Sequence, residues 1–190
     1  MNSLTRKLLW LPLLAAVFLT GCGTISTMGK LEDGAGTEAS KMWDKWIAAD
    51  GDIAMATTWS RKVAPGVTVK DIEDTFVAVA SERNMKGVGE LPLSQELEAR
   101  TGVKQKFLKV YSFCSPSTAR IMVDFSPAMG AYLPCRLTVV EQADGLWIYT
   151  LNMDMMVKMG RKLPSPLKEE AMKVRDTIYQ MMDRAAKGAF

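Results

Sequence analysis

Two apolar runs joined by a short polar turn constrain this chain more than any other feature of its sequence. Residues 133–141 alternate apolar and polar side chains, and residues 146–151 are rich in aromatic and β-branched types. Asp144-Gly145 stands between the two runs. Asp-Gly in this position is a strong signal for a β-hairpin. The sequence therefore predicts two neighbouring antiparallel strands.

Further strands and helices are predicted around this hairpin. Periodicity of two predicts strands at residues 53–63, 87–93 and 107–113, and periodicity near 3.6 predicts helices at residues 37–49, 69–84, 94–100 and 118–125. A long final helix is expected after Ser165, with Pro166 at its first position. Thr68 and Asp71 have the spacing of a helix-capping pair. The sum is an α+β domain, with a largely antiparallel sheet and helices on one face.

The first 21 residues predict a signal peptide that does not belong to this domain. A basic pair, Arg6 and Lys7, precedes an apolar run at residues 8–19, too short to span a bilayer comfortably. Leu19-Thr20-Gly21-Cys22 follows and resembles the lipobox of bacterial lipoproteins. That resemblance implies cleavage before Cys22, and attachment of diacylglycerol and acyl chains such as palmitate to Cys22. The alternative is an uncleaved membrane helix.

The remaining chain divides into a tether and one domain. Residues 22–50 form the predicted lipid-anchored tether with its short helix, and residues 51–190 form the single α+β domain. Gly23 after the lipidated cysteine, by the same resemblance, favours the outer membrane of the bacterial cell envelope, with the domain facing the periplasm. Trp43 and Trp46 on the short helix could lie at the membrane interface, but we expect them to pack on the domain.

Composition excludes several classes of function. The chain has no histidine, which removes the commonest general base and the commonest metal ligand. It has 24 basic and 21 acidic residues; loss of Arg6 and Lys7 with the leader leaves 22 against 21. This balance gives no electrostatic signal for nucleic acid. We predict no catalytic residues and no cofactor.

Cys114 and Cys135 are the residues with the most distinctive chemistry. Once Cys22 is lipidated, they form an even pair in an oxidising compartment, which favours a structural disulfide. A thiol-redox pair, two ligands for Cu(I), and unpaired thiols remain open. The chain has no Cys-x-x-Cys motif.

Two weaker candidates accompany the cysteines. Thioethers also suit Cu(I), and four methionines stand close together, but methionine fills irregular cores equally well, so no metal is favoured. These weak copper candidates are Met153, Met155, Met156 and Met159. Pro116, Pro134 and Arg136 are candidates for lining a ligand pocket. We expect Arg120, Asp124 and Asp154 to have structural roles.

Three motifs carry a resemblance to a known family. Phe113-Cys114-Ser115-Pro116, Leu133-Pro134-Cys135-Arg136 and the segment Thr150 to Asp154 are similar to the domain-of-unknown-function 302 family, over about residues 54–186. Residues 168–182 resemble its lipoprotein-type members. The resemblance implies a β-α-β-sheet-α fold, like that of the TATA-binding protein, and often a homodimer. It supplies no activity.

The sequence therefore predicts a lipid-anchored binding or interaction module without catalytic activity. Its partner would be a small ligand or another envelope protein, besides the membrane that holds its anchor. The alternative is a thiol-redox or copper-handling protein that uses Cys114 and Cys135. A purely structural envelope lipoprotein is a third hypothesis.

Overall fold

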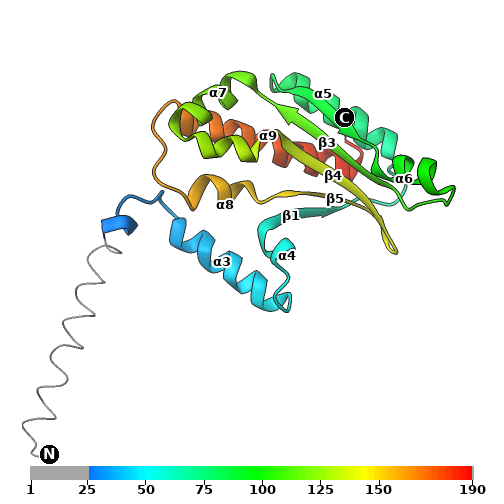
Figure 1. Cartoon of the computed structure of the whole chain (residues 1–190), viewed down its shortest axis with the longest axis horizontal. Helices are drawn as coiled ribbons and strands as arrows, with labels where there is room; N and C mark the ends of the chain where they lie inside the picture. The colour runs from blue at the N-terminus through cyan, green and yellow to red at the C-terminus, as the bar shows by residue number, and fades with distance from the viewer. Residues whose placement is uncertain (1–25, 190) are drawn as a thin grey trace, which may run out of the picture.

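A five-stranded antiparallel sheet forms the centre of this computed structural model (Figure 1). The strands are β1 (Thr58–Lys62), β2 (Lys86–Leu91), β3 (Leu108–Cys114), β4 (Cys135–Gln142) and β5 (Gly145–Leu151), in the order β1-β5-β4-β3-β2. Every neighbouring pair is antiparallel. The predicted hairpin is β4–β5, in which Gln142 pairs with Gly145. Gly145 has a φ of 119°, a backbone conformation that favours glycine at this turn.

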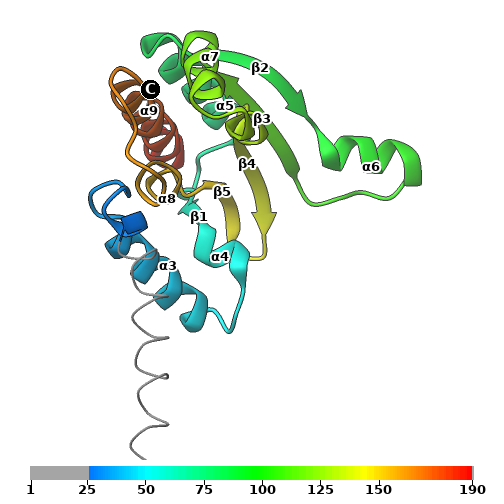
Figure 2. The same ribbon diagram turned by 60° about the vertical axis from the view of Figure 1, so that its left-hand side comes forward.

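Helices cover one face of the sheet, so the predicted α+β class is confirmed. The helices are α3 (Ala35–Ala48), α4 (Ile53–Thr57), α5 (Val69–Glu82), α6 (Leu93–Thr101), α7 (Pro116–Phe125), η1 (Pro127–Tyr132), α8 (Met153–Lys158) and α9 (Leu167–Lys187). Figure 2 shows α5, α7 and α9 on the same side of the sheet. α5 packs beside α9, and α7 and α8 also contact α9.

The structure describes residues 26–189. The predicted signal peptide at residues 1–21 and the predicted lipidation site Cys22 lie outside this range. Among the helices that the structure does describe, none combines the length and the apolar character needed to cross a membrane.

A capping box marks the start of α5, whereas α9 begins without a side-chain cap. Thr68 Oγ1 accepts the backbone N–H of Asp71, and Asp71 Oδ2 accepts that of Thr68, so the predicted capping pair of α5 is confirmed. α9 begins at Leu167 and not at Pro166, and Ser165 donates to Glu169 Oε1 instead of capping the backbone. The predicted cap of α9 was therefore wrong.

The predicted first strand was wrong over its first half. Residues 53–57 form the short helix α4, and only Thr58–Lys62 is a strand. Asp52 Oδ1 accepts the backbone N–H groups of Ala54 and Met55, at 2.8 and 3.3 Å, and so begins a helical turn. Local capping thus outweighs the alternating pattern that indicated a strand.

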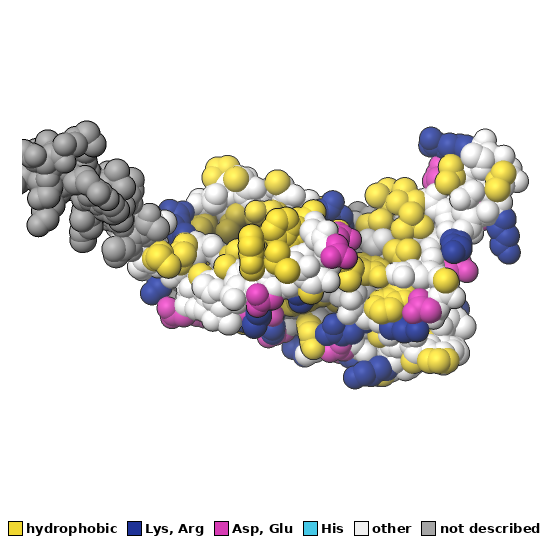
Figure 3. All heavy atoms as spheres, turned by 90° about the horizontal axis from the view of Figure 1, so that it is seen from below, with side chains coloured by type: hydrophobic (Ala, Val, Ile, Leu, Met, Phe, Trp, Pro, Cys, Tyr) yellow, Lys and Arg dark blue, Asp and Glu magenta, His cyan; other side chains and the backbone are white. Residues whose placement is uncertain are grey.

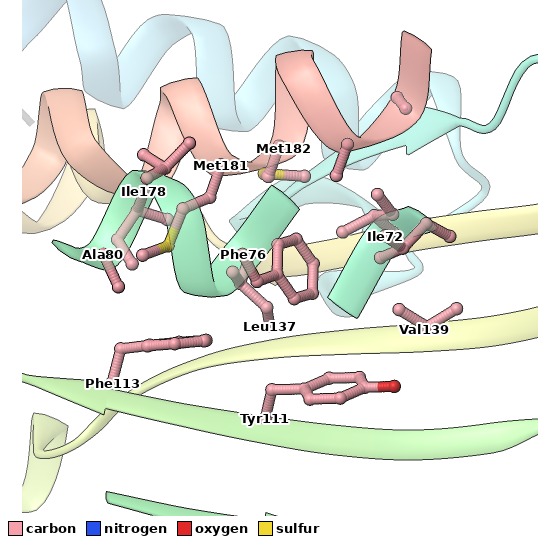
Figure 4. Close-up of a cluster of buried hydrophobic side chains, with 14 of the residues drawn as sticks. Ile72, Phe76, Ala80, Tyr111, Phe113, Leu137, Val139, Ile178, Met181 and Met182 are labelled. Atoms are coloured by element: carbon pink, nitrogen blue, oxygen red, sulfur yellow. The ribbon is translucent and has the colours of Figure 1, made fainter. Parts of the chain in front are cut away.

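The core lies between the sheet and the pair α5 and α9, as Figure 4 shows. Phe76 of α5 is 1% exposed and makes edge-to-face contacts with Tyr111 and Phe113 of β3, with ring centroids 5.4 and 6.0 Å apart. The other fully buried large side chains come from the same layers. They include Ile72, Val79, Leu137, Val139, Ile148, Ile178, Met181 and Met182.

Buried carboxylates attach the segment before β1 to the helical layer. Glu32 is 5% exposed, and its carboxylate accepts hydrogen bonds from Lys168 Nζ at 2.7 Å and from the backbone N–H of Leu163 at 3.3 Å. Glu38 of α3 is also buried and lies 3.8 Å from Lys158 Nζ of α8. These contacts dock α3 against α8 and the start of α9.

We expect Phe76→Ala to lower the free energy of unfolding by about 3–5 kcal/mol, because it leaves a cavity between α5 and β3. Val77→Ala is the matched control on the same helix: Val77 is 66% exposed, and its truncation should change stability by less than about 0.5 kcal/mol. Urea denaturation followed by circular dichroism measures both. Equal effects of the two substitutions would contradict this description of the core.

The docking of residues 31–48 should depend on pH through Glu32. The hydrogen bond from Lys168 is the main reason that the pKa of Glu32 lies below its ordinary value. A carboxyl whose pKa is lowered by folding stabilises the native state above its unfolded pKa of about 4.3, and this stabilisation is lost as pH falls through the lowered folded pKa.

We therefore expect the stability difference between the wild type and Glu32→Gln to be largest near neutral pH and to shrink in acid. Urea denaturation near pH 7 and near pH 3 measures this difference. Asp44→Asn, an exposed change on α3, is the control and should show little difference at either pH. A Glu32→Gln effect of the same size at both pH values would contradict the assignment.

Candidate functional site: an apolar cavity at one end of the sheet

A cavity of about 410 Å³ lies where β3 ends and β4 begins. Helices α7, α8, α9 and η1, strands β1, β2 and β5, and the segments that precede β2 and α9 contribute its remaining walls. The lining residues are Thr58, Met85, Leu91, Val110, Cys114, Ser115, Thr118, Ala119, Met122, Met129, Tyr132, Leu133, Pro134, Cys135, Arg136, Thr138, Tyr149, Thr150, Leu151, Met153, Met156, Val157, Leu163, Leu167, Ala171 and Val174. Most of them are apolar, so the wall favours apolar contacts.

The cavity extends around the edge of the sheet. Successive residues of a strand point to opposite faces. Cys135 shares its face of β4 with the core residue Leu137, whereas Arg136 and Thr138 lie on the other face. Because Cys135, Arg136 and Thr138 all line the cavity, it reaches both faces of the sheet at the start of β4.

Sulfur-bearing side chains are unusually frequent in the lining. Methionine has three rotatable bonds and a polarisable thioether, so a wall that contains several of them can adapt to ligands of different shape. Seven of the lining residues carry sulfur: Met85, Cys114, Met122, Met129, Cys135, Met153 and Met156.

The buried hydroxyl groups of the wall are already paired within the protein. Thr150 Oγ1 donates to the carbonyl oxygen of Arg136 at 2.6 Å. Thr118 Oγ1 lies 3.0 Å from Ser115 Oγ and 3.4 Å from a carboxylate oxygen of Glu170. Across the described residues, no buried side-chain nitrogen or oxygen lacks a hydrogen-bond partner. The deep part of the cavity therefore demands no polar group from a ligand.

Cys114 and Cys135 line the same cavity as free thiols, not as the disulfide that the sequence favoured. The strand register explains the difference. Cys135 pairs with Phe113, so Cys114 is one residue out of step with it and leaves the sheet on the opposite face. A disulfide needs Cβ atoms that approach each other.

Both thiols are protonated at neutral pH. Burial, with a smaller contribution from the neighbouring Cys114, raises the pKa of Cys135 to about 11. Burial also raises the pKa of Cys114. Because the thiolate is the reactive and metal-binding form, these two groups are poor nucleophiles near pH 7.

The cavity includes only some of the other predicted site residues. Pro134 and Arg136 line it, whereas Pro116 begins α7 and does not. Of the methionines proposed for copper, Met153 and Met156 line the cavity, and the remaining two, at positions 155 and 159, do not. No group of three or more Cys, Asp or Glu side chains within residues 26–189 could hold a metal ion.

The charged candidates form ion pairs away from the cavity. Arg120 pairs with Asp124 along α7. Asp154 accepts two hydrogen bonds from Arg175, each of 3.1 Å. Burial alone would raise the pKa of Asp154, but the hydrogen bonds from Arg175 and Lys158 outweigh burial and lower this pKa. The pair of Asp154 and Arg175 connects α8 with α9, whereas Arg120 and Asp124 pair within α7.

Sequence reasoning missed the part of the wall that comes from distant segments. Met85 precedes β2, Met122 belongs to α7, and Ala171 belongs to α9. The helical spacing of α9 places Ala171 on the same face as Val174 and Ile178. Its small size, beside larger residues on the same face, was the one signal of space beneath it.

Comparison with known proteins identifies relatives of the fold. The family model described as "Domain of unknown function DUF302" matches residues 59–185. A solved structure described as the crystal structure of an uncharacterized conserved protein DUF302 from Bacillus stearothermophilus aligns with a TM-score of 0.55 and 17% identity, covering 68% of this chain and 98% of that one. At this identity the likeness shows the fold alone. No curated protein matched the chain.

The reduced protein should react with iodoacetamide slowly near pH 7 and much faster near pH 10, because both thiol pKa values are raised by burial. Peptide mass spectrometry measures each site separately, and Cys114, whose pKa is raised less, should be alkylated before Cys135. Unfolding in urea is the control and should make the two rates similar. Rapid alkylation of native Cys135 near pH 7 would contradict the pKa assignment.

Proposed function

Because this chain belongs to the DUF302 family, whose description assigns no activity, we propose its function from the cavity itself: it binds a small, largely apolar molecule. Ligand sites in proteins typically occupy about 300–1,000 Å³. The cavity of about 410 Å³ falls within this range. Its apolar lining, with every buried hydroxyl paired internally, is the single observation that carries the proposal.

The same wall supports binding without catalysis. The ionisable groups that line the cavity are the two thiols, Arg136, and the phenols of Tyr132 and Tyr149. No lining carboxylate or histidine is present to act as a general base. The thiols hold their protons at neutral pH, which makes them unsuitable as nucleophiles.

The site of action is part of the proposal. The leader and the Leu19-Thr20-Gly21-Cys22 motif support a lipid anchor at Cys22 in the bacterial outer membrane, with the domain in the periplasm. A lipid anchor at Cys22 would hold the cavity close to the membrane, which is a source of apolar molecules. The proposal favours a small ligand over an envelope protein as partner, and a homodimer stays a prediction.

One observation favours a second candidate function, the handling of Cu(I). Seven sulfur-bearing residues line the cavity, and thiolate and thioether ligands select this ion. Copper binding would require the thiols to lose their protons, which their raised pKa opposes. A thiol-redox function meets the same obstacle. Binding of an apolar molecule needs no such change.

Filling the cavity should abolish binding. Ala171→Phe places an aromatic ring in the space beneath α9, and we expect it to weaken binding of the neutral fluorescent probe N-phenyl-1-naphthylamine by about tenfold or more. Ala99→Phe is the matched control, because Ala99 is exposed on α6 and does not line the cavity. Fluorescence titration measures both.

Binding of the probe by the two variants with equal affinity would contradict the proposal. A parallel titration with Cu(I), in competition with a chelator, tests the second candidate. Tight copper binding that is lost in Cys114→Ser and Cys135→Ser, together with no probe binding, would replace the first candidate with the second.

A further inference from the structure

Arg136 is the only charged residue in the cavity wall within the described chain. It lies on β4 opposite Ser112 of β3, on the sheet face that α5 and α9 do not cover. Its backbone is held in place, since its carbonyl oxygen accepts the hydroxyl of Thr150. The residue as a whole is exposed, so the guanidinium lies at the mouth of an otherwise apolar space.

The guanidinium of Arg136 has no hydrogen-bond, ion-pair or aromatic-ring partner among the described residues. This sets it apart from the other described arginines, each of which has a side-chain or ring partner. These pairs are Arg61 with Asp183, Arg83 with Gln180, Arg100 with Glu96, Arg120 with Asp124, Arg161 with the ring of Phe125, Arg175 with Asp154, and Arg184 with Glu82. A guanidinium carries five N–H donors, and those of Arg136 are not bound to an acceptor of the protein. Arg136 can therefore bind an incoming anion without breaking an existing contact.

Two hydroxyl groups stand on the same sheet face as Arg136. Thr138 and Tyr149 are cross-strand partners, and both line the cavity. Gln142 Nε2 donates to Tyr149 Oη, so this phenol leans toward the hairpin end of the sheet, away from Arg136, and Thr138 is the nearer hydroxyl. The described lining contains no carboxylate that would repel an anion.

The attraction for an anion would be local to this mouth. On the face shown in Figure 3, basic and acidic side chains are interspersed among hydrophobic patches. The whole chain carries a net charge of only +3. The surface as a whole therefore does not attract anions. A preference of the cavity for an anionic ligand would come from Arg136.

We propose that the ligand is an anionic amphiphile. Its apolar chain occupies the sulfur-lined cavity, and its carboxylate or phosphate binds the guanidinium of Arg136, which lies on the same sheet face as the hydroxyl of Thr138. This inference rests on the proposed function, because it needs the cavity to accept an apolar chain. It adds the charge and the orientation of the ligand.

Displacement of N-phenyl-1-naphthylamine by three molecules with the same twelve-carbon chain tests the proposal. Dodecanol is neutral, laurate carries a carboxylate, and dodecyl phosphate carries a phosphate. Near pH 8 and at low salt, we expect both anions to bind wild-type protein about fivefold or more tightly than dodecanol. A stronger effect of dodecyl phosphate would point to a phospholipid-type head group, and a stronger effect of laurate to a fatty acid.

Arg136→Gln should bring the anion-to-dodecanol affinity ratio to about one. Arg136→Lys should retain part of the preference. Arg100→Gln, which removes an exposed arginine of α6 outside the cavity, is the matched control and should retain all of it. Raising the salt from about 20 to about 500 mM should reduce the preference in the wild type.

Equal affinities of the wild type for dodecanol and the two anions would overturn the inference and leave the proposed function standing. An anion preference that is retained in Arg136→Gln would also overturn the inference and leave the proposed function standing. Loss of dodecanol binding together with anion binding in Arg136→Gln would mean that Arg136 shapes the cavity and does not bind the head group, which also overturns it. If the wild type binds none of the three, the proposed function fails as well.

Discussion

The register between β3 and β4 is the constraint on which the rest of the structure depends. Pairing of Tyr111 with Leu137 and of Phe113 with Cys135 brings the apolar faces of the two strands to the same side. α5 and α9 then cover that side with Phe76, Ile178 and their neighbours. A shift of one residue would turn Leu137 outward and Arg136 into the core. The burial of this one face therefore fixes the sheet, the helical layer and the position of every cavity residue that the strands supply.

The cavity follows from an uneven distribution of side-chain size along α9. Near the middle and end of the helix, Ile178, Met181 and Met182 fill the space above the sheet completely. One or two turns earlier, the same face presents Ala171 and Val174, which are smaller and line the cavity. Methionines from other elements line the remaining space but do not fill it. The buried polar groups of this wall are paired within the protein, so none of those described is left unsatisfied.

The elements that depend on local chemistry could be predicted from the sequence. The β4–β5 hairpin follows from Asp144-Gly145, and the start of α5 follows from Thr68 and Asp71, because turn and cap residues act over a few positions. The strand predicted from residue 53 failed at its start for the same reason, since Asp52 begins a helical turn there. Cys114 and Cys135 lie at the ends of the neighbouring strands β3 and β4, but their relative faces depend on a register that no local pattern gives.

The rest of the site could not be predicted because it is assembled by tertiary packing. Met85 and Met122 are separated from Ala171 by large parts of the chain, and nothing in their local sequence indicates that they border one space. Arg136 was singled out as a pocket residue, but its lack of a partner is a property of the folded protein. In the folded protein, the chemistry of the cavity lies in its apolar wall and in Arg136, the one cation among its described lining residues, and not in the thiols.

Methyl NMR of protein labelled with ¹³C at the methionine methyl groups tests the central claim most directly, namely that this cavity is the ligand site. On addition of dodecanol, the account predicts shifts for the lining residues Met85, Met122, Met129, Met153 and Met156. Met182, buried on α9 outside the cavity, and Met28, which is 64% exposed, should keep their positions. Shifts confined to Met28, or no shifts in the five lining methyl groups at saturating ligand, would contradict the account.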